Sequence, residues 1–360
     1  MIVASARFSE ALAYSHRTLT RITIDGDTIP LESGSLNLNR PANVRRTANL
    51  LLRDDPATPG LLAGITTASQ VLVEKGITFL DRSTEYVTVG TLYVQELDGD
   101  PDRLALAVVL SDAAQLVDDY PLITAWSPSS GGSPLTVVNS IKSLVDEAVP
   151  GTPTWSVDAG ISTSQATLAG AVYKAGTGRW SAINELAAML GAAVFVDAVG
   201  VWHIDPAEPD PTPVARIATG AGGVLVQASI KATRRDTYNG IAIEWGSTDT
   251  EGGIVLVTDD DPTSPTYWDG TWGRRPKPTT KLAVETEAEA IAAAAALLAG
   301  SRGAQSGINF QAVYNPLLEP NDVVTIATSP STEADHVLDR ITLPLVGGTM
   351  TAETRVVSAA

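Results

Sequence analysis

The chain has 360 residues, of which 44% are hydrophobic and 18% are charged, with a net charge of −17 at pH 7 and no cysteine. This hydrophobic content suffices for sizeable cores and excludes a disordered chain, while the length suggests about two or three domains. The lack of cysteine excludes disulfides, thiolate zinc sites and cysteine nucleophiles, and the acidic balance argues against nonspecific binding of nucleic acid, which needs basic patches.

The first third of the chain has mainly β patterning after a short helix predicted over Ala4–Tyr14. The predicted strands, separated by Asp, Gly and Pro turn signals, are Thr18–Ile24, Ile29–Leu38 with a break at Ser33-Gly34, Val44–Arg53, Val71–Leu80, Tyr86–Leu97 and Leu104–Val109. Several strands at roughly regular spacing, with little helix, predict a β-barrel or sandwich. Glu10 interrupts the N-terminal apolar residues, so we expect no secretory signal there.

The pattern changes near Ser111 to a mixture of helices and strands. The predicted elements are a helical turn at Asp112–Val117, a flexible loop at Trp126–Pro134, an amphipathic helix at Leu135–Val149, a helix at Ala182–Leu190 capped by Ser181 and Gly191, and a hairpin of Ala193–Val196 with Val201–Ile204. The prolines of Pro206–Pro213 then favour an extended linker and a domain boundary.

The last third returns to β patterning. Its predicted strands are Leu225–Thr233, Tyr238–Trp245, Ile254–Thr258, Ile308–Tyr314, Asp322–Ile326 and Val337–Leu343, with a long loop over Asp259–Pro278. A helix is predicted over Glu287–Ala299, with a Thr286/Glu289 capping box and Gly300 after its end. No segment reaches about 18 uninterrupted apolar residues, so no membrane-spanning helix is predicted.

No catalytic, cofactor-binding or metal-binding residue is predicted. The histidines, His16, His203 and His336, are scattered and have no zinc-hydrolase spacing, so we interpret them as structural or surface residues. Gly176-Thr177-Gly178 lacks the other residues of a phosphate cradle and is interpreted as a turn.

Two further groups of residues have competing interpretations. Asp259-Asp260-Asp261 lacks the alternating ligand spacing of a calcium loop, and a solvated turn is favoured over a metal site. Trp268 and Trp272, in a loop rich in Gly and Pro, are expected to be the most exposed tryptophans, as interface anchors or as carbohydrate contacts. Glu185 has apolar neighbours and no second acid that would indicate a glycosidase pair.

Three motifs, in order along the chain, resemble those of actinobacteriophage tail hub proteins. They are Ser5-Ala6-Arg7-Phe8 with Ala11-Leu12 and Ser15-His16, then Trp180–Gly191 before the hairpin, and then Arg234–Gly240 followed by the helix and Asn315–Ile326. Gly34-Ser35-Leu36 and Arg45-Arg46-Thr47 match two strands of the same family. The resemblance covers most of the chain and transfers no catalytic residue to it.

The resemblance implies a β-rich α+β protein with two related β-barrel (tail-tube-like) domains around an α+β middle domain. The expected divisions are 1–111, an N-terminal barrel-like hub domain, 112–213, the middle domain, and 214–360, a C-terminal barrel-like hub domain with one helix. Strand exchange between the domains is compatible with such a plan. We further expect Val323, Val324 and Ile326 to be buried and the turn Pro316–Asn321 to lie at a barrel rim.

The implied function is that of a structural virion protein, a baseplate hub at the tail tip of a bacteriophage, assembled in the host cytoplasm. Such hubs are homotrimeric rings that join a tail tube, or distal tail protein, above to a tail tip or fibre protein below. DNA passes through the ring during ejection without specific binding, and acidic side chains facing the lumen would keep it from adhering. The alternatives are a tail-associated peptidoglycan hydrolase and the hub of a headless injection particle.

Overall fold

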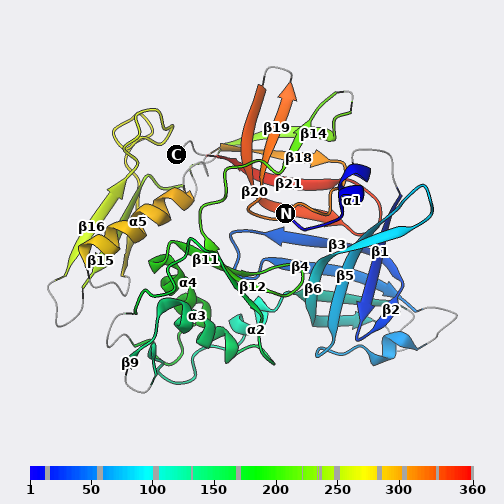
Figure 1. Cartoon of the computed structure of the whole chain (residues 1–360), viewed down its shortest axis with the longest axis horizontal. Coiled ribbons are helices and arrows are strands. Elements are labelled where there is room, and N and C mark those ends of the chain that lie inside the picture. Colours follow the sequence, from blue (N-terminus) through cyan, green and yellow to red (C-terminus); the bar gives the residue numbers. More distant parts are fainter. Residues whose placement is uncertain are drawn as a thin grey trace.

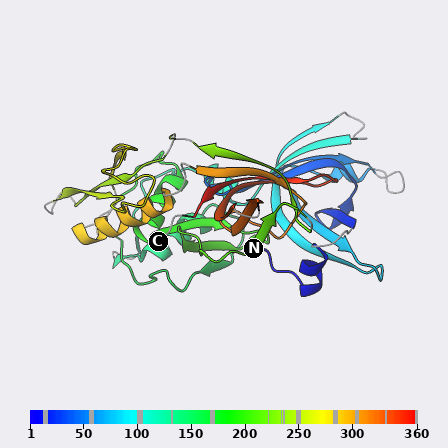
Figure 2. The same ribbon diagram turned by 90° about the horizontal axis from the view of Figure 1, so that it is seen from above.

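The computed structural model describes residues 1–12, 17–54, 60–99, 105–130, 133–167, 172–220, 222–232, 234, 237–246, 252–281, 286–301, 306–329 and 332–357. The fold is β-rich, with few helices. A 13-stranded sheet joins the first and last thirds of the chain, and the middle of the chain and part of the last third form smaller units beside it (Figure 1). Seen from above, these units extend from one end of the large sheet (Figure 2).

The first third contributes the strands that end the large sheet on one side. Its elements are α1 (Ala6–Ala11), β1 (Arg17–Ile24), β2 (Asp27–Ile29), β3 (Leu31–Asn39), β4 (Arg46–Arg53), the 3₁₀ helix η1 (Leu61–Gly64), β5 (Gln70–Thr78), β6 (Thr84–Gly99) and β7 (Ala105–Ser111). Alternate residues of β4 face the core, where Ala48, Leu50 and Leu52 are at most 3% exposed. The strand pattern of this third is therefore confirmed, because a period of two buries one face of each strand.

The predicted break at Ser33-Gly34 is wrong. β3 continues through both residues, and the strand is interrupted instead at Pro30, between β2 and β3. A bulge between Leu31 and Ser33 follows the proline. Gly34 is needed for close packing, because a Cβ there would lie 2.9 Å from the carbonyl oxygen of Asn49.

The last third continues the same sheet. Its strands are β13 (Ala215–Ala218), β14 (Leu225–Ala232), β18 (Ser306–Ala312), β19 (Val323–Ser329), β20 (Thr332–Pro344) and β21 (Met350–Val356). Val323, Val324 and Ile326 are at most 1% exposed, as expected. β21 was not predicted, because its core-facing residues include the small Ala352 and the polar Thr354.

The two outer thirds repeat one strand order. The first runs β3-β4-β7-β6-β5-β1, and the second runs β14-β18-β21-β20 and continues through β19 to β13. Neighbouring strands are antiparallel in both halves, with one exception. β13 pairs with β19 in parallel, whereas the corresponding pair of the first half, β1 with β5, is antiparallel. The halves meet where β20 pairs with β3, and one hydrophobic core runs through both.

The bulges of the two halves also correspond. The β3–β4 ladder has a bulge between Leu31 and Ser33, and the β14–β18 ladder has one between Leu225 and Gln227. A second pair of bulges lies in the β6–β7 and β20–β21 ladders, at Val94/Glu96 and Leu338/Arg340 respectively. Because bulges fix register, the halves can be aligned residue by residue.

The middle of the chain is an α+β unit. Its elements are α2 (Ala114–Asp118), β8 (Ser129–Ser130), β9 (Ser133–Pro134), α3 (Val137–Asp146), β10 (Trp155–Val157), α4 (Arg179–Met189), β11 (Ala192–Val196) and β12 (Trp202–Pro206). A 3-stranded sheet, β10-β12-β11, and the helices enclose a separate core that includes Trp180 and Trp202.

Three details of the middle unit bear on the predictions. β8 and β9 pair with each other within Trp126–Pro134, the segment expected to be a flexible loop. α4 begins after Gly178 rather than after Ser181, and no side chain caps it. Gly191, with φ of 61°, does follow the helix as expected.

A last small unit holds β15 (Gly240–Trp245), β16 (Gly253–Thr258) and β17 (Pro276–Lys281) in one sheet, order β16-β15-β17, with α5 (Glu287–Ser301) packed on it. The capping box is confirmed, since Thr286 N donates to Glu289 Oε2 and Glu289 N to Thr286 Oγ1. Gly300 lies inside the helix rather than after it. β17 occupies the end of the predicted loop, so that loop was predicted too long.

None of the helices in the described ranges is long and apolar enough to cross a membrane.

Candidate functional site

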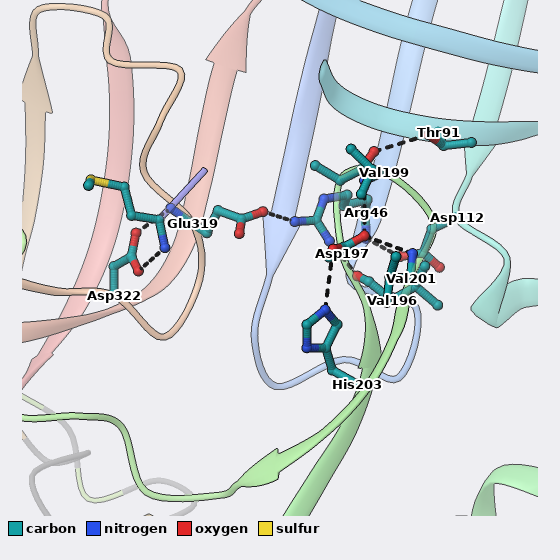
Figure 3. Close-up of polar contacts among 12 residues, drawn as sticks. Arg46, Thr91, Asp112, Val196, Asp197, Val199, Val201, His203, Glu319 and Asp322 are labelled. Carbon is teal, nitrogen blue, oxygen red and sulfur yellow. Dashed lines mark hydrogen bonds and ion pairs between the residues drawn. The ribbon is translucent and has the colours of Figure 1, made fainter. Parts of the chain in front are cut away.

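A cluster of polar contacts lies where the two halves and the middle unit meet (Figure 3). A cleft of about 950 Å³ opens there, lined by the N-terminal residues, β6, the β11–β12 hairpin and the turn before β19. Arg45 and Arg46, at the end of the β3–β4 turn, do not line the cleft but contact two of its lining residues, Phe195 and Glu319.

Arg46, at the start of β4, connects that strand to the hairpin and to the turn before β19. Its backbone N–H donates to Asp112 Oδ2 at 2.8 Å, and its guanidinium donates to the carbonyl oxygen of Val196 and forms an ion pair with Glu319. The Arg46 side chain is 4% exposed. A buried guanidinium needs its partners, so Arg46 fixes β4, β11 and the turn before β19 relative to one another.

Arg40 and Arg45 extend this contact. Arg40 donates to Asn321 Oδ1 at 2.8 Å and to the carbonyl oxygen of Ala207 at 3.0 Å, so it joins the last third to the linker after β12. The Arg45 guanidinium stacks over the Phe195 ring at 4.0 Å. Burial lowers the pKa of Arg45 to about 9, and the neighbouring charge of Arg40 lowers it as well.

The β11–β12 hairpin is held by a histidine between two carboxylates. His203 Nε2 lies 3.2 Å from Asp197 Oδ2, and His203 Nδ1 lies 3.4 Å from Asp205 Oδ2. Hydrogen bonds to Asp197 and Asp205 raise the pKa of His203 to about 9. At neutral pH the ring is therefore a cation, and it stacks on Phe195 with ring centroids 5.0 Å apart. Thr91 Oγ1 anchors the hairpin tip to β6 by donating to the carbonyl oxygen of Ala198 at 3.1 Å.

The stretch Asn315–Asp322 forms the opposite wall. Leu317 and Leu318 are at most 2% exposed, and Ile2 N donates to the carbonyl oxygen of Leu317 at 2.8 Å. Asn321 adopts φ of 81°, a left-handed conformation that asparagine tolerates. The Pro316–Asn321 turn, expected at a barrel rim, is thus packed against the chain's own first residues.

The carboxylates of the cleft have structural partners. Glu319 pairs with Arg46, Asp197 and Asp205 flank His203, and Asp322 Oδ2 accepts from Glu319 N at 2.8 Å. Asp112 has a pKa raised by burial to about 6, but it is 0% exposed and accepts backbone N–H groups, including that of Ala114 at 3.1 Å. A glycosidase acid has to reach a substrate, and this one cannot.

The other residues singled out from the sequence do not join this cleft, apart from His203. His16 lies outside the described residues. His336 is 3% exposed, shares a hydrogen bond of 3.0 Å with Thr354 Oγ1, and has a pKa lowered by burial. Glu185 lies on α4 and is half-buried. Gly176-Thr177-Gly178 is a turn before α4, as interpreted.

Asp259 is not the solvated residue that was expected. It is 1% exposed, and its Oδ2 accepts hydrogen bonds from Ser264 Oγ and Thr266 Oγ1 at 2.5 and 2.6 Å. Within the described ranges, no group of three or more His, Asp or Glu side chains could hold a metal ion. Asp259 therefore organises the loop that follows β16.

Trp268 and Trp272 are half-buried rather than exposed. Trp268 covers β15 so closely that a Cβ on Gly240 would lie 2.7 Å from its ring. The Arg234 guanidinium lies over the Trp272 ring at 4.8 Å. Both tryptophans thus pack within the small unit.

Sequence reasoning did not assign a role to Arg40, Arg45 or Arg46. A signal was present in the sequence, because Arg45 and Arg46 stand at the start of an apolar strand. Arginine is almost never fully buried unless it is paired, so two of them at such a position indicate buried partners. Their partners in the middle unit and in the last third could not be inferred, since nothing local in the sequence points to them.

Comparisons with known proteins agree on the fold. No protein-family model matches the sequence, and neither does any curated protein. Among solved structures, the chain is similar to a tail protein from Neisseria meningitidis, with a TM-score of 0.67, 13% identity, and coverage of 94% of this chain and 96% of that one. The chain has the fold of a phage tail protein.

Two other structures support the same assignment. The 43 kDa tail protein of prophage MuSo2 from Shewanella oneidensis matches with a TM-score of 0.62, 13% identity, and coverage of 94% of this chain and 98% of that one. Prophage tail protein gp18 from Listeria monocytogenes matches with a TM-score of 0.55, 11% identity, and coverage of 94% and 95%. The resemblance seen in the sequence motifs is thereby confirmed at the level of fold.

Proposed function

We propose that the protein is a structural baseplate hub of a phage tail, a homotrimeric ring that joins the tail tube to the tail tip. The observation that carries this proposal is the likeness of fold to phage tail proteins over 94% of the chain. The divisions 1–111, 112–213 and 214–360 then correspond to one tube-like domain, a middle domain and a second tube-like domain. The repeated strand order of the outer thirds supports a relationship between the two tube-like domains.

A chain with two equivalent halves suits a position between rings of different symmetry. Three copies would present six similar units to a hexameric tube or distal tail protein on one side, and three middle units to a tip or fibre protein on the other. The buried contacts of Arg46 support this role, because they fix the middle unit against both halves.

The DNA channel would be lined by the bare face of the large sheet. Residues on the face opposite the core are mostly neutral and polar, and each is at least partly exposed: Asn37, Asn39, Thr47, Asn49, Gln227, Ser229, Asn309, Gln311, Thr342 and Thr351. Lys231 and Arg340 on this face lie 2.9 and 3.4 Å from Glu353. DNA would then pass because this face lacks the basic clusters that bind phosphates. Repulsion by acidic side chains, expected from the net charge, would be less important.

The solution mass of the purified protein tests the ring. Light scattering over a range of concentrations should give a trimer, or a monomer that becomes a trimer only with a tail partner. A stable dimer would contradict the proposal. A zymogram on host cell walls should show no clearing, since the carboxylates of the cleft are engaged with Arg46, His203 and backbone N–H groups.

A further inference from the structure

The strand β14 ends the large sheet with an uncovered apolar face. In the described part of the chain β14 pairs only with β18. Ile230 and Val226 are 84% and 58% exposed, although they lie on the face that carries the buried Phe310 of β18. A long edge strand with exposed apolar side chains is a site for pairing with another strand.

In the first half of the chain, the strand that corresponds to β14 is β3, and its edge is paired with another strand. Aligned by their bulges, Ile230 of β14 corresponds to Leu36 of β3, and Lys231 corresponds to Asn37. Leu36 is 0% exposed. The edge of β3 is occupied by β20, with Thr342 opposite Asn37 and Leu343 opposite Leu36.

The strand that fills this edge also has an equivalent, and that equivalent is free. β20 pairs with β19 up to Val337 and then, on the same edge, with β3 from Arg340 onward. Its counterpart β6 pairs with β5 up to Tyr93, and the described ladders leave the corresponding edge of Glu96–Gly99 without a partner strand. The matched bulges place Asp98 of β6 at the position of Thr342 of β20.

We infer that Glu96–Gly99 of β6 from a second copy of this chain adds to the free edge of β14. The pairing is antiparallel and repeats the β20–β3 junction, so Leu97 lies opposite Ala232, Asp98 opposite Lys231 and Gly99 opposite Ile230. The inference deepens the proposed ring, because it names the strands and the register through which its subunits join.

The chemistry of the facing residues supports this occupant. In the junction within the chain, Thr342 Oγ1 and Asn37 Oδ1 lie 3.1 Å apart. The equivalent positions between copies carry Asp98 and Lys231, which are opposite charges and are both exposed in the single chain. Opposite charges directly across an antiparallel pair stabilise it, and like charges destabilise it.

The geometry also specifies the kind of assembly. The two edges that pair are different surfaces, so the contact is head-to-tail and generates a ring or an open filament. The rotation between the halves is already set within each chain by the β20–β3 junction. A closed ring of three copies would contain three junctions within chains and three between chains, in alternation.

Cysteine pairs test the register directly, because the natural sequence has no cysteine. Residues opposite each other in an antiparallel ladder have Cα atoms about 4.5–5.5 Å apart, which is within the range of a disulfide. Oxidised Asp98→Cys/Lys231→Cys protein should give a covalent ladder that ends at trimer on a non-reducing gel. Mixing the two single variants should give covalent dimers, and each single variant alone should give none.

The matched control is Asn37→Cys/Thr342→Cys, which should form a disulfide within one chain and leave the oligomer unchanged. A trimer in light scattering without the Asp98–Lys231 crosslink would overturn this interface and leave the ring intact. A protein that stays monomeric at the highest concentration reached, also when a tail partner is added, and that gives no crosslink would overturn both. As a second measurement, Asp98→Lys should lower the trimer fraction, and adding Lys231→Asp should restore it.

Discussion

The guanidinium of Arg46 forms an ion pair with the carboxylate of Glu319, 273 residues later in the chain. The same guanidinium donates to the carbonyl oxygen of Val196 in the middle unit. One side chain thus connects the first third, the middle and the last third (Figure 3). For a protein proposed to join a tail tube to a tail tip, a contact that fixes its parts relative to one another matters more than any reactive group.

Replacing Arg46 should be the most costly change at this junction. Arg46→Met keeps much of the side-chain volume but leaves Glu319 and the Val196 carbonyl oxygen without their donor. Removing one partner of a buried pair costs about 3–5 kcal/mol. Urea denaturation of the purified variant should measure a loss of this size in the free energy of unfolding.

The matched control is Arg53→Met, on the same strand. Arg53 pairs with Glu32, and both side chains are exposed, at 63% and 38%. An exposed pair contributes about 0–1 kcal/mol, so the control should lose little stability. Equal losses in the two variants would mean that Arg46 has no special role at the junction.

His203 should make stability depend on pH at the alkaline side. Its pKa is raised from 6.5 to about 9 by Asp197 and Asp205, so the folded state holds the proton more tightly than the unfolded state does. This stabilisation is complete below pH 6.5 and is lost as the pH rises through 9. Solvent screens the half-buried ring, so we expect about 1–2 kcal/mol rather than the full value of the shift.

The measurement compares the free energy of unfolding of the natural protein and of His203→Gln at pH 6 and pH 9.5. The difference between the two proteins should be larger at pH 6. Using the difference removes the effect of Lys75, whose pKa is lowered by burial to about 8 and which acts in the opposite direction. A difference that does not change with pH would argue against a charged His203.

The strands and helices with regular patterns were predictable from the sequence, and the reasons for the exceptions are local. β4 was found because its buried residues alternate, β19 because a short apolar run follows a turn, and α3 because its apolar stripe has a helical period. β21 was missed since Ala352 and Thr354 give a weak apolar signal. α5 runs past Gly300 because its packing on β15 and β16 outweighs the preference of glycine for a helix end.

The junction could not be predicted, because its contacts join residues far apart in the sequence. Nothing near Arg46 indicates Glu319 or Val196 as its partners. The internal repeat was also invisible in the residues, since Leu36 corresponds to Ile230 and Asn37 to Lys231 without any shared motif. The similarity of the two halves is visible in the hydrogen-bond register and in the positions of the bulges, but not in the side chains.

Asp259 should control the order of the loop after β16. Asp259→Ala removes the acceptor for Ser264 and Thr266, and leaving two hydroxyls without it should cost about 1–3 kcal/mol of local stability. Limited trypsin digestion should then cut faster after Arg274, because local opening exposes it; the bond after Arg275 resists trypsin because Pro276 follows.

Asp260→Ala is the control for this loop, since Asp260 is exposed and accepts a hydrogen bond from Thr258 Oγ1 at 2.6 Å rather than from the loop residues Ser264 and Thr266. It should be cut at the natural rate. EDTA should not change the digestion of the natural protein. Faster cleavage on adding EDTA would revive a metal site at Asp259–Asp261.

The proposed channel face can be tested by adding positive charge to it. Thr47 and Thr351 lie on the bare face of β4 and β21 and are exposed. The Thr47→Lys/Thr351→Lys variant should bind double-stranded DNA in a gel-shift assay, with an affinity that falls steeply as salt increases, because each contact releases counterions. Ser162→Lys/Ser181→Lys, which changes the charge equally at exposed positions of the middle unit, should bind much more weakly. Equal binding by both variants would show that net charge alone decides, and it would remove the support for a channel along this face.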